Sequence, residues 1–412
     1  MIERPRRRPS SEGRSGILSV VLNPQLLSLS IGHGTVDAYA NLLPMMYPML
    51  TVALGLNYSQ VGLAVALYTL SASLSQPLFG YVADRFGGRH MAAAGIVWMA
   101  TMVSLVGFTW DYWSLVAVLT VAGLGTAAFH PQGAMNAGDV GGHKASAMSV
   151  FMLGGNIGFA LGPMLGALVF STALGLRGAL LLWLPGVLMA LWLYKAIGRV
   201  DVKRQAIKAQ ALAGAALPAA RVPIVGVAAL VLVVMLRSWA SSALINFIPL
   251  LFHERGLSLA WASQVLFLTL VAAAAGGVIG GFIADAWGRK RVTFISLAAS
   301  GPAIFLFLQS AEAWMALGAL VVGFLLGAST AVTLVMGQEV LPRNVGMASG
   351  LIMGLGFATG GVGVSITGTL ADNFGLFTAL NSIWPLPLLG ALLCLALRKP
   401  ERSPGGVAVD GG

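Results

Sequence analysis

The sequence has little charge and almost no cysteine. Of its 412 residues, 9% are charged and 57% are hydrophobic, and the mean hydropathy is +0.85. Soluble domains carry charge on about a quarter of their residues, so a soluble protein is excluded. Cys394 is the single cysteine, which excludes a disulfide framework and a cysteine-based metal site.

Long charge-free runs indicate membrane-spanning helices. A helix crosses a bilayer with about 20 apolar residues, so the chain has room for about a dozen crossings and none for a large soluble domain. We predict an all-α membrane protein with twelve transmembrane helices in two six-helix halves. The predicted spans cover residues 24–47, 58–82, 90–109, 112–136, 145–170, 178–197, 222–250, 259–283, 291–310, 313–337, 345–369 and 376–397.

Lysine and arginine favour the cytoplasmic side of a membrane, and their distribution predicts the orientation. With the N-terminus inside, 21 of them lie inside and 2 outside, Arg177 and Arg255, while Arg237 lies within a span. The net charge of +10 is thereby explained by topology, and no nucleic-acid binding is expected. We predict a monomer in the lipid bilayer of the inner (plasma) membrane, with both termini cytoplasmic. Its parts are a basic N-terminus (1–23), a first half (24–197), a linker (198–221), a second half (222–397) and a flexible tail (398–412).

An internal repeat divides the chain. The run from Gly80 to Arg89, which contains Asp84, recurs from Gly281 to Lys290 around Asp285, 201 positions later. The pair Gly55-Leu56 recurs as Gly256-Leu257 at the same offset of 201 positions. A repeat of half the chain is typical of secondary transporters, whose binding site lies near the midplane between the halves.

These motifs resemble those of the major facilitator superfamily, and the resemblance covers nearly the whole chain. Within it, the sequence is similar to the fosmidomycin-resistance efflux family. That likeness rests on four motifs: His33-x-x-x-Asp37-x-Tyr39, Phe129-His130-Pro131, Leu236-Arg237-Ser238-Trp239 and Gln338-Glu339-x-Leu-Pro342. Where the family has Glu and Arg after the His-Pro pair, this chain has Gln132 and Met135, so substrate and coupling have to be established for this chain itself.

Two charges in mid-span are the main candidates for transport chemistry. Ionisable residues inside a membrane are costly and tend to face a cavity or a partner. At 1.5 Å per residue, Asp37 lies about 20 Å past Pro24 and Arg237 about 21 Å past Pro223, at equivalent places in the repeat. We predict that Asp37 binds the proton and that Arg237 binds substrate and alternates as its partner. A purely structural ion pair is the other interpretation.

Histidines and aromatic residues extend this candidate site. His33 lies one turn from Asp37 on the same helix face, and His130 near the inner end of its span could approach it. Because histidine titrates near neutrality, we expect both to relay protons; the alternative is that each merely packs. Tyr39 and Trp239 are predicted to contact substrate, although anchoring at the membrane interface is an equally ordinary role for aromatic residues.

Two further groups of residues are predicted to control conformation. The repeated loops and the inner helix ends suggest cytoplasmic gating, with stable turns as the alternative, by Asp84, Arg85, Arg89, Asp285, Arg289, Glu339 and Arg343. The spacing Gly158-x-x-x-Gly162-Pro163 resembles the antiporter motif of drug exporters in the superfamily and would let helices approach closely; ordinary small-residue packing is the alternative.

Together these features predict a secondary active transporter without cofactors and without enzymatic activity, since no phosphate-binding loop and no catalytic constellation is found. The most specific prediction is proton-coupled efflux of a small polar or anionic compound, such as a fosmidomycin-like drug, by alternating access. Metabolite uptake or export by symport or facilitated diffusion, and a non-transporting membrane sensor, are the alternatives.

Overall fold

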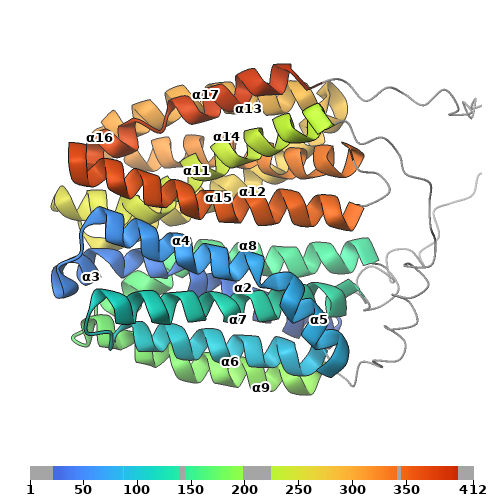
Figure 1. Ribbon diagram of the computed structural model, residues 1–412, viewed down its shortest axis with the longest axis vertical. Helices are drawn as coiled ribbons and strands as arrows, with labels where there is room; N and C mark the ends of the chain where they lie inside the picture. Colours follow the sequence, from blue (N-terminus) through green and yellow to red (C-terminus); the bar gives the residue numbers. More distant parts are fainter. Residues whose placement is uncertain (1–21, 87, 139–143, 198–223, 341–344, 398–412) are drawn as a thin grey trace, which may run out of the picture.

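The computed structural model describes residues 22–86, 88–138, 144–197, 224–340 and 345–397, and every element in these ranges is a helix (Figure 1). The N-terminal half contains α2 (Pro24–Asn41), η1 (Leu43–Met45), α3 (Tyr47–Leu54), α4 (Tyr58–Leu74), α5 (Gln76–Phe86), α6 (Gly88–Val106), α7 (Tyr112–Gly138), α8 (Lys144–Phe170), η2 (Gly175–Leu182) and α9 (Trp183–Ala196). The C-terminal half contains α11 (Ile224–Glu254), α12 (Leu259–Trp287), α13 (Arg289–Gln309), α14 (Glu312–Val340), α15 (Val345–Phe374), α16 (Leu376–Asn381) and α17 (Pro385–Leu395). The all-α prediction is confirmed.

Eleven helical segments among the described residues are long and apolar enough to cross a membrane. The remaining predicted crossing is the first, which runs from Pro24 to Leu54 as α2, η1 and α3. Proline removes a backbone donor and clashes with the preceding turn, and Pro44 and Pro48 lie where this crossing is interrupted. The first crossing is thus both broken and, because it carries His33 and Asp37, comparatively polar.

The sequence repeat corresponds to a repeated turn. Gly55 and Gly256 both have positive φ, at 62° and 72°, a conformation that glycine adopts without strain. Two residues later, Asn57 caps α4 and Ser258 caps α12 through their side-chain oxygens. The second crossing of each half therefore begins with the same local structure.

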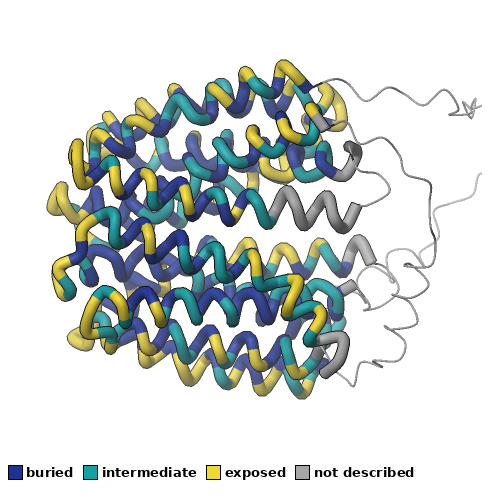
Figure 2. The backbone as a smooth tube through the Cα atoms, in the orientation of Figure 1, coloured by how far each residue is buried: buried dark blue, intermediate teal, exposed yellow. Residues whose placement is uncertain are grey.

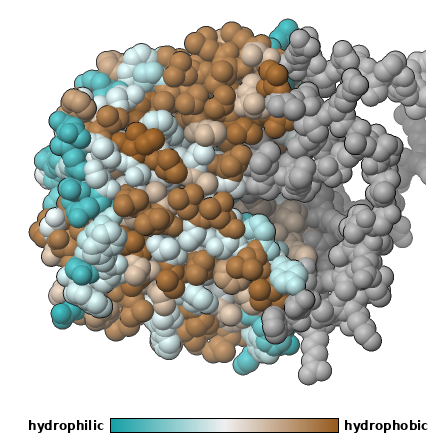
Figure 3. All heavy atoms as spheres, in the orientation of Figure 1, coloured by the Kyte–Doolittle hydropathy of each residue, from teal (hydrophilic) through white to brown (hydrophobic). Residues whose placement is uncertain are grey.

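The two halves lie side by side, with α4 against α15 and α8 against α12 (Figure 1). We call the end where α9 stops and α11 begins the linker end, and the opposite end, where α3 meets α4 and α15 meets α16, the far end. Figure 2 shows that buried residues follow the inward faces of the helices. In the face drawn in Figure 3, hydrophobic residues cover most of the described surface and hydrophilic ones gather at the far end.

The hydrophobic core is shared at the far end and divided toward the linker end. One cluster of buried side chains joins both halves and includes Leu43 and Leu50 of the first half with Leu244, Phe247 and Val364 of the second. Toward the linker end, the described residues form separate clusters, one within the N-terminal half and two within the C-terminal half. Among the residues whose side chains are described, the core that joins the two halves thus lies at the far end.

Candidate transport site

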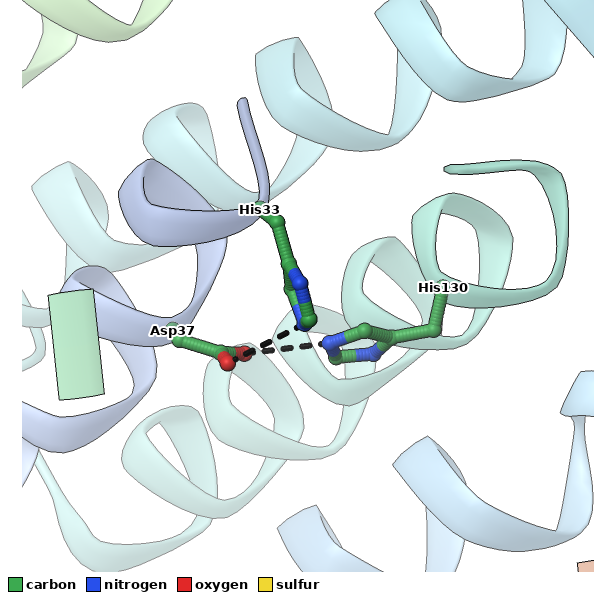
Figure 4. A group of neighbouring side chains, drawn as sticks. All are labelled: His33, Asp37 and His130. Atoms are coloured by element: carbon green, nitrogen blue, oxygen red, sulfur yellow. Dashed lines mark hydrogen bonds and ion pairs between the residues drawn. The ribbon is translucent and has the colours of Figure 1, made fainter. Parts of the chain in front are cut away.

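A cluster of two histidines and one aspartate lies inside the N-terminal half. His33 Nε2 is 3.2 Å from Asp37 Oδ2, and His130 Nε2 is 3.0 Å from Asp37 Oδ1 (Figure 4). The four-residue spacing on α2 places His33 and Asp37 on one face, and α7 supplies His130. The structure therefore brings together the three residues that the sequence suggested for proton coupling. Two imidazoles and a carboxylate within 4.8 Å are also a donor set known from metal sites, but the contacts of Asp37 with both rings account for this cluster without an ion.

The backbone of α8 fixes the orientation of the His33 ring. His33 Nδ1 is 2.9 Å from the carbonyl oxygen of Phe151, and the two rings stack with centroids 4.2 Å apart. A carbonyl oxygen only accepts hydrogen bonds, so Nδ1 carries a hydrogen and donates. In a neutral ring Nε2 then has a lone pair and faces a carboxylate oxygen. The close approach of His33 to Asp37 consequently requires a proton on one of the two.

The small-residue face of α8 packs against α2 within the same half. A Cβ atom added to Gly162 would lie 2.7 Å from the carbonyl oxygen of Ala38, and Gly158 is packed directly against the backbone of Gly34. Asn41 donates to the carbonyl oxygen of Phe159 at 2.7 Å. The helix continues through Pro163. The glycines of the predicted antiporter motif therefore allow close contact with the helix that carries His33 and Asp37.

Arg237 lies apart from the histidine cluster, on α11 of the other half. Its Nη1 donates to Thr330 Oγ1 at 2.8 Å and its Nη2 to Ser238 Oγ at 3.3 Å, whereas its buried Nε has no partner in the part of the chain that the structure describes. Among the described residues, Arg237 forms no ion pair with Asp37. In this conformation each charge has its own neighbours, and the predicted alternation between them stays a prediction.

Tyr39 and Trp239, the two aromatic residues predicted to contact substrate, have different surroundings. Tyr39 is 4% exposed, and its hydroxyl donates to the carbonyl oxygen of Leu182 at 2.6 Å. Trp239 is partly buried, and its Nε1 donates to Thr367 Oγ1 at 2.9 Å. The polar atom of each side chain is therefore occupied within its own half.

Comparison with known proteins agrees with this architecture. The model of the family described as Major Facilitator Superfamily matches residues 29–230 and again residues 230–410. The chain belongs to the major facilitator superfamily. It is therefore a multi-pass membrane transporter and not an enzyme.

Curated relatives within the superfamily cover most of the chain. It is 29% identical to the Fosmidomycin resistance protein of Escherichia coli (strain K12), over 89% of this chain and 90% of the relative. It is 31% identical to the Uncharacterized MFS-type transporter YfnC of Bacillus subtilis (strain 168), over 90% of this chain and 92% of the relative. The resemblance to the fosmidomycin-resistance family is confirmed.

Solved structures share the fold of this superfamily member. A bacterial homolog to the human lysosomal transporter Spinster, in an inward-facing and occupied conformation, matches with a TM-score of 0.77 and 15% identity over 94% of this chain and 97% of that chain. The nucleoside transporter NupG matches with a TM-score of 0.69 and 14% identity over 90% of this chain and 98% of that chain. The predicted major facilitator fold is confirmed.

Bases of the repeated superfamily loop bind helix ends inside their own halves. Arg89 Nε donates to the carbonyl oxygen of Tyr194 at 2.6 Å, and its guanidinium lies 3.8 Å from the centre of the Tyr194 ring. In the second half, Lys290 Nζ donates to the carbonyl oxygens of Leu395 at 2.6 Å and Leu397 at 2.7 Å. Both bases thus bind near the C-terminus of the last helix of their half, where cations are favoured. In this conformation these contacts of Arg89 therefore lie within its own half, and its predicted gating role stays a prediction.

The other predicted gating residues are described only in part. Asp285 and Arg289 form an ion pair of 3.8 Å one turn apart, and the Asp285 side chain is 73% exposed. Outside the residues whose side chains are described lie Asp84, Arg85, Glu339 and Arg343.

A polar contact between the halves at the far end was missed by sequence reasoning. Asp372 of α15 accepts hydrogen bonds from the backbone N–H groups of Tyr58 and Ser59 at 2.8 and 2.9 Å. The Tyr58 hydroxyl donates to Glu254 at the end of α11. The sequence did contain a signal for this contact: the chain has only 14 acidic residues, and Glu254 and Asp372 both lie at predicted outer helix ends.

Proposed function

We propose that this transporter exports a small anionic or polar compound, of the fosmidomycin type, in exchange for protons that enter the cell. The linker end faces the cytoplasm in this proposal, because the basic residues concentrate in the predicted inside segments. Support for the substrate class comes from the relative named Fosmidomycin resistance protein. Transport proceeds by alternating access between the two halves, which is general for transporters built from repeats.

Proton coupling is assigned to Asp37, and the observation that carries it is the contact of this carboxylate with both histidine rings. The side chain of Asp37 is only 18% exposed, so a change in its charge has to be balanced by nearby groups. His33 and His130 supply that balance, because an imidazole can accept a proton and donate it again. In this proposal the two rings pass protons between Asp37 and the cytoplasmic side.

Substrate binding is assigned to Arg237. Its guanidinium is bonded to the hydroxyls of Thr330 and Ser238, which are neutral, and its buried Nε has no partner among the residues described. A partly buried cation that has no carboxylate partner among the described residues favours an anionic ligand, and a guanidinium binds phosphonate or carboxylate oxygens in a bidentate manner. An ionised Asp37 competes for Arg237 in the outward-open state, whereas a protonated Asp37 leaves it for substrate. Protons and substrate therefore cross the membrane in opposite directions.

The test uses purified protein in proteoliposomes with an imposed pH gradient and fosmidomycin as the probe. Asp37→Asn is expected to abolish pH-driven accumulation and to retain substrate binding, because the amide keeps the shape and cannot titrate. Arg237→Ala is expected to lose binding. Arg255→Ala is the matched control, since Arg255 lies at a helix end and donates to the carbonyl oxygen of Leu308; it is expected to bind and transport normally.

Two results would refute parts of this assignment. If Asp37→Asn still concentrates fosmidomycin under a pH gradient, the proton site lies elsewhere, with His33 or His130 as the next candidates. If proton and substrate move in the same direction, the transporter is a symporter. Substrate-dependent proton flux of either sign distinguishes a transporter from a sensor.

A further inference from the structure

The far end contains a set of polar residues that crosses between the halves, which we call the far-end latch: Tyr58 and Ser59 of α4, Glu254 of α11 and Asp372 of α15. Three hydrogen bonds between described residues form it, two from backbone N–H groups to the Asp372 carboxylate and one from the Tyr58 hydroxyl to Glu254. All three join an N-terminal-half helix to a C-terminal-half helix. The prediction of gating residues from the repeated loop concerned the opposite end of the molecule.

Asp372 completes the N-terminal cap of a helix in the other half. The first N–H groups of a helix have no partner inside it. In α4, the Asn57 side chain satisfies only the N–H of Gln60, and the N–H groups of Tyr58 and Ser59 are satisfied by Asp372. A carboxylate is favoured there by the partial positive charge of the helix end. Separating the halves at the far end removes this cap from α4.

Glycines bring the two helices close enough for this contact. A Cβ atom added to Gly62 of α4 would lie 2.8 Å from the Cα atom of Ser365 on α15, and one added to Gly368 of α15 would lie 2.8 Å from the carbonyl carbon of Tyr58. The backbones of α4 and α15 therefore touch beside the latch, and the core that joins the halves surrounds this region. By contrast, Arg89 and Lys290 at the linker end bind within their own halves.

We propose that the far-end latch is the outer gate of the transporter: its hydrogen bonds hold the far end closed while substrate enters from the linker end, and they break when the far end opens. This inference rests on the orientation and the alternating access proposed above. It requires no assumption about which residue carries the proton or the substrate. Weakening the latch should therefore increase the population of molecules open at the far end.

The experiment measures access to one cysteine from outside intact cells. Cys394 is replaced by Ser, and Ala66→Cys places the reporter on α4, where Ala66 is 4% exposed and lies against Gly361 of α15. A membrane-impermeant maleimide reaches this thiol only when the halves separate at the far end. Asp372→Asn, which leaves one acceptor oxygen and no charge, is expected to raise the labelling rate roughly fivefold to tenfold, as for loss of a charged helix cap. Tyr58→Phe, which removes one hydroxyl, should raise it less.

Asp111→Asn is the matched control. Asp111 also caps a helix with its carboxylate, accepting from the N–H of Ser114 at 2.7 Å, but this helix, α7, belongs to the same half. The Asp111→Asn variant should therefore be labelled at the same rate as the parent protein. The outer-gate proposal is overturned if Asp372→Asn and Tyr58→Phe label like the parent in normally expressed protein, or if Asp111→Asn raises labelling equally. Because labelling needs neither substrate nor a pH gradient, failure of the proposed antiport would leave this result unaffected.

Discussion

Replacing Gly155 by alanine tests whether the position of the His33 ring controls transport. The Cβ atom would lie 2.6 Å from His33 Nε2 and 2.7 Å from Nδ1, whereas ordinary contacts begin at 3.4 Å. The nearest ring atom, Cε1, would lie only 2.4 Å from this Cβ, so the ring has to move by about 1 Å. A shift of that size lengthens either the 2.9 Å bond to the Phe151 carbonyl or the 3.2 Å contact with Asp37. A displacement of ~1 Å at a reacting group can cost ~100-fold in rate, so we expect a tenfold to hundredfold loss of pH-driven transport, as an order of magnitude.

The assay compares initial rates of pH-driven fosmidomycin transport with fosmidomycin binding to the same preparation. Binding should be retained, because Arg237 lies in the other half. Gly178→Ala is the control, since its Cβ would meet α8 at the same 2.7 Å, against the carbonyl oxygen of Val169 rather than a histidine ring. It should lower the yield of folded protein while keeping the rate per folded molecule within about threefold, an estimate based on unchanged site geometry.

A double-mutant cycle separates the ring position from general packing. In a His33→Gln background, Gly155→Ala should reduce transport no further, because residues that act as a unit are not additive. Equal losses in Gly155→Ala and Gly178→Ala, or additive losses with His33→Gln, would refute the reasoning and would leave only helix packing as the role of Gly155.

Three further substitutions test the gating and packing assignments. Asp84→Asn should keep expression and reduce transport severalfold if Asp84 gates the cytoplasmic side; unchanged flux would leave only a turn. Arg89→Gln should lower the melting temperature by a few degrees, about the effect of losing ~1 kcal/mol, because Arg89 binds the end of α9; a loss of transport without loss of stability would instead restore a gating role. Gly162→Leu should stop or uncouple transport by forcing α8 away from α2, and normal coupled transport would contradict a role for this glycine.

The sequence was sufficient for the fold because the relevant signals are local. Charge-free runs and the 201-residue offset depend on neighbouring residues or on direct comparison of two segments. The pairing of His33 with Asp37 was also local, since four residues separate them on one helix. His130 was a weaker prediction because it lies on another helix, and the structure places its Nε2 3.0 Å from Asp37 Oδ1.

Contacts between distant helices could not be obtained in the same way. The depth argument placed Asp37 and Arg237 at similar levels, but depth does not determine separation within the membrane plane, and each residue has other partners here. The small-residue face of α8 was recognisable, but its neighbour α2 was not. The far-end latch depends on two helix ends 314 residues apart, and neither end has a motif.

The polarity of the first crossing has a consequence for how the protein is made. Helices enter the bilayer individually when they are apolar enough, and Pro24–Leu54 is the crossing absent from the eleven segments that satisfy this requirement among the described residues. Asp37 pairs with His130 of α7, and His33 donates a hydrogen bond to a backbone carbonyl of α8; both partners are synthesised about a hundred residues later. At the usual ~5–20 residues per second, these partners follow the first helix after about 5 to 20 seconds. The charges that we assign to proton coupling thus make the insertion of this helix dependent on the rest of the N-terminal half.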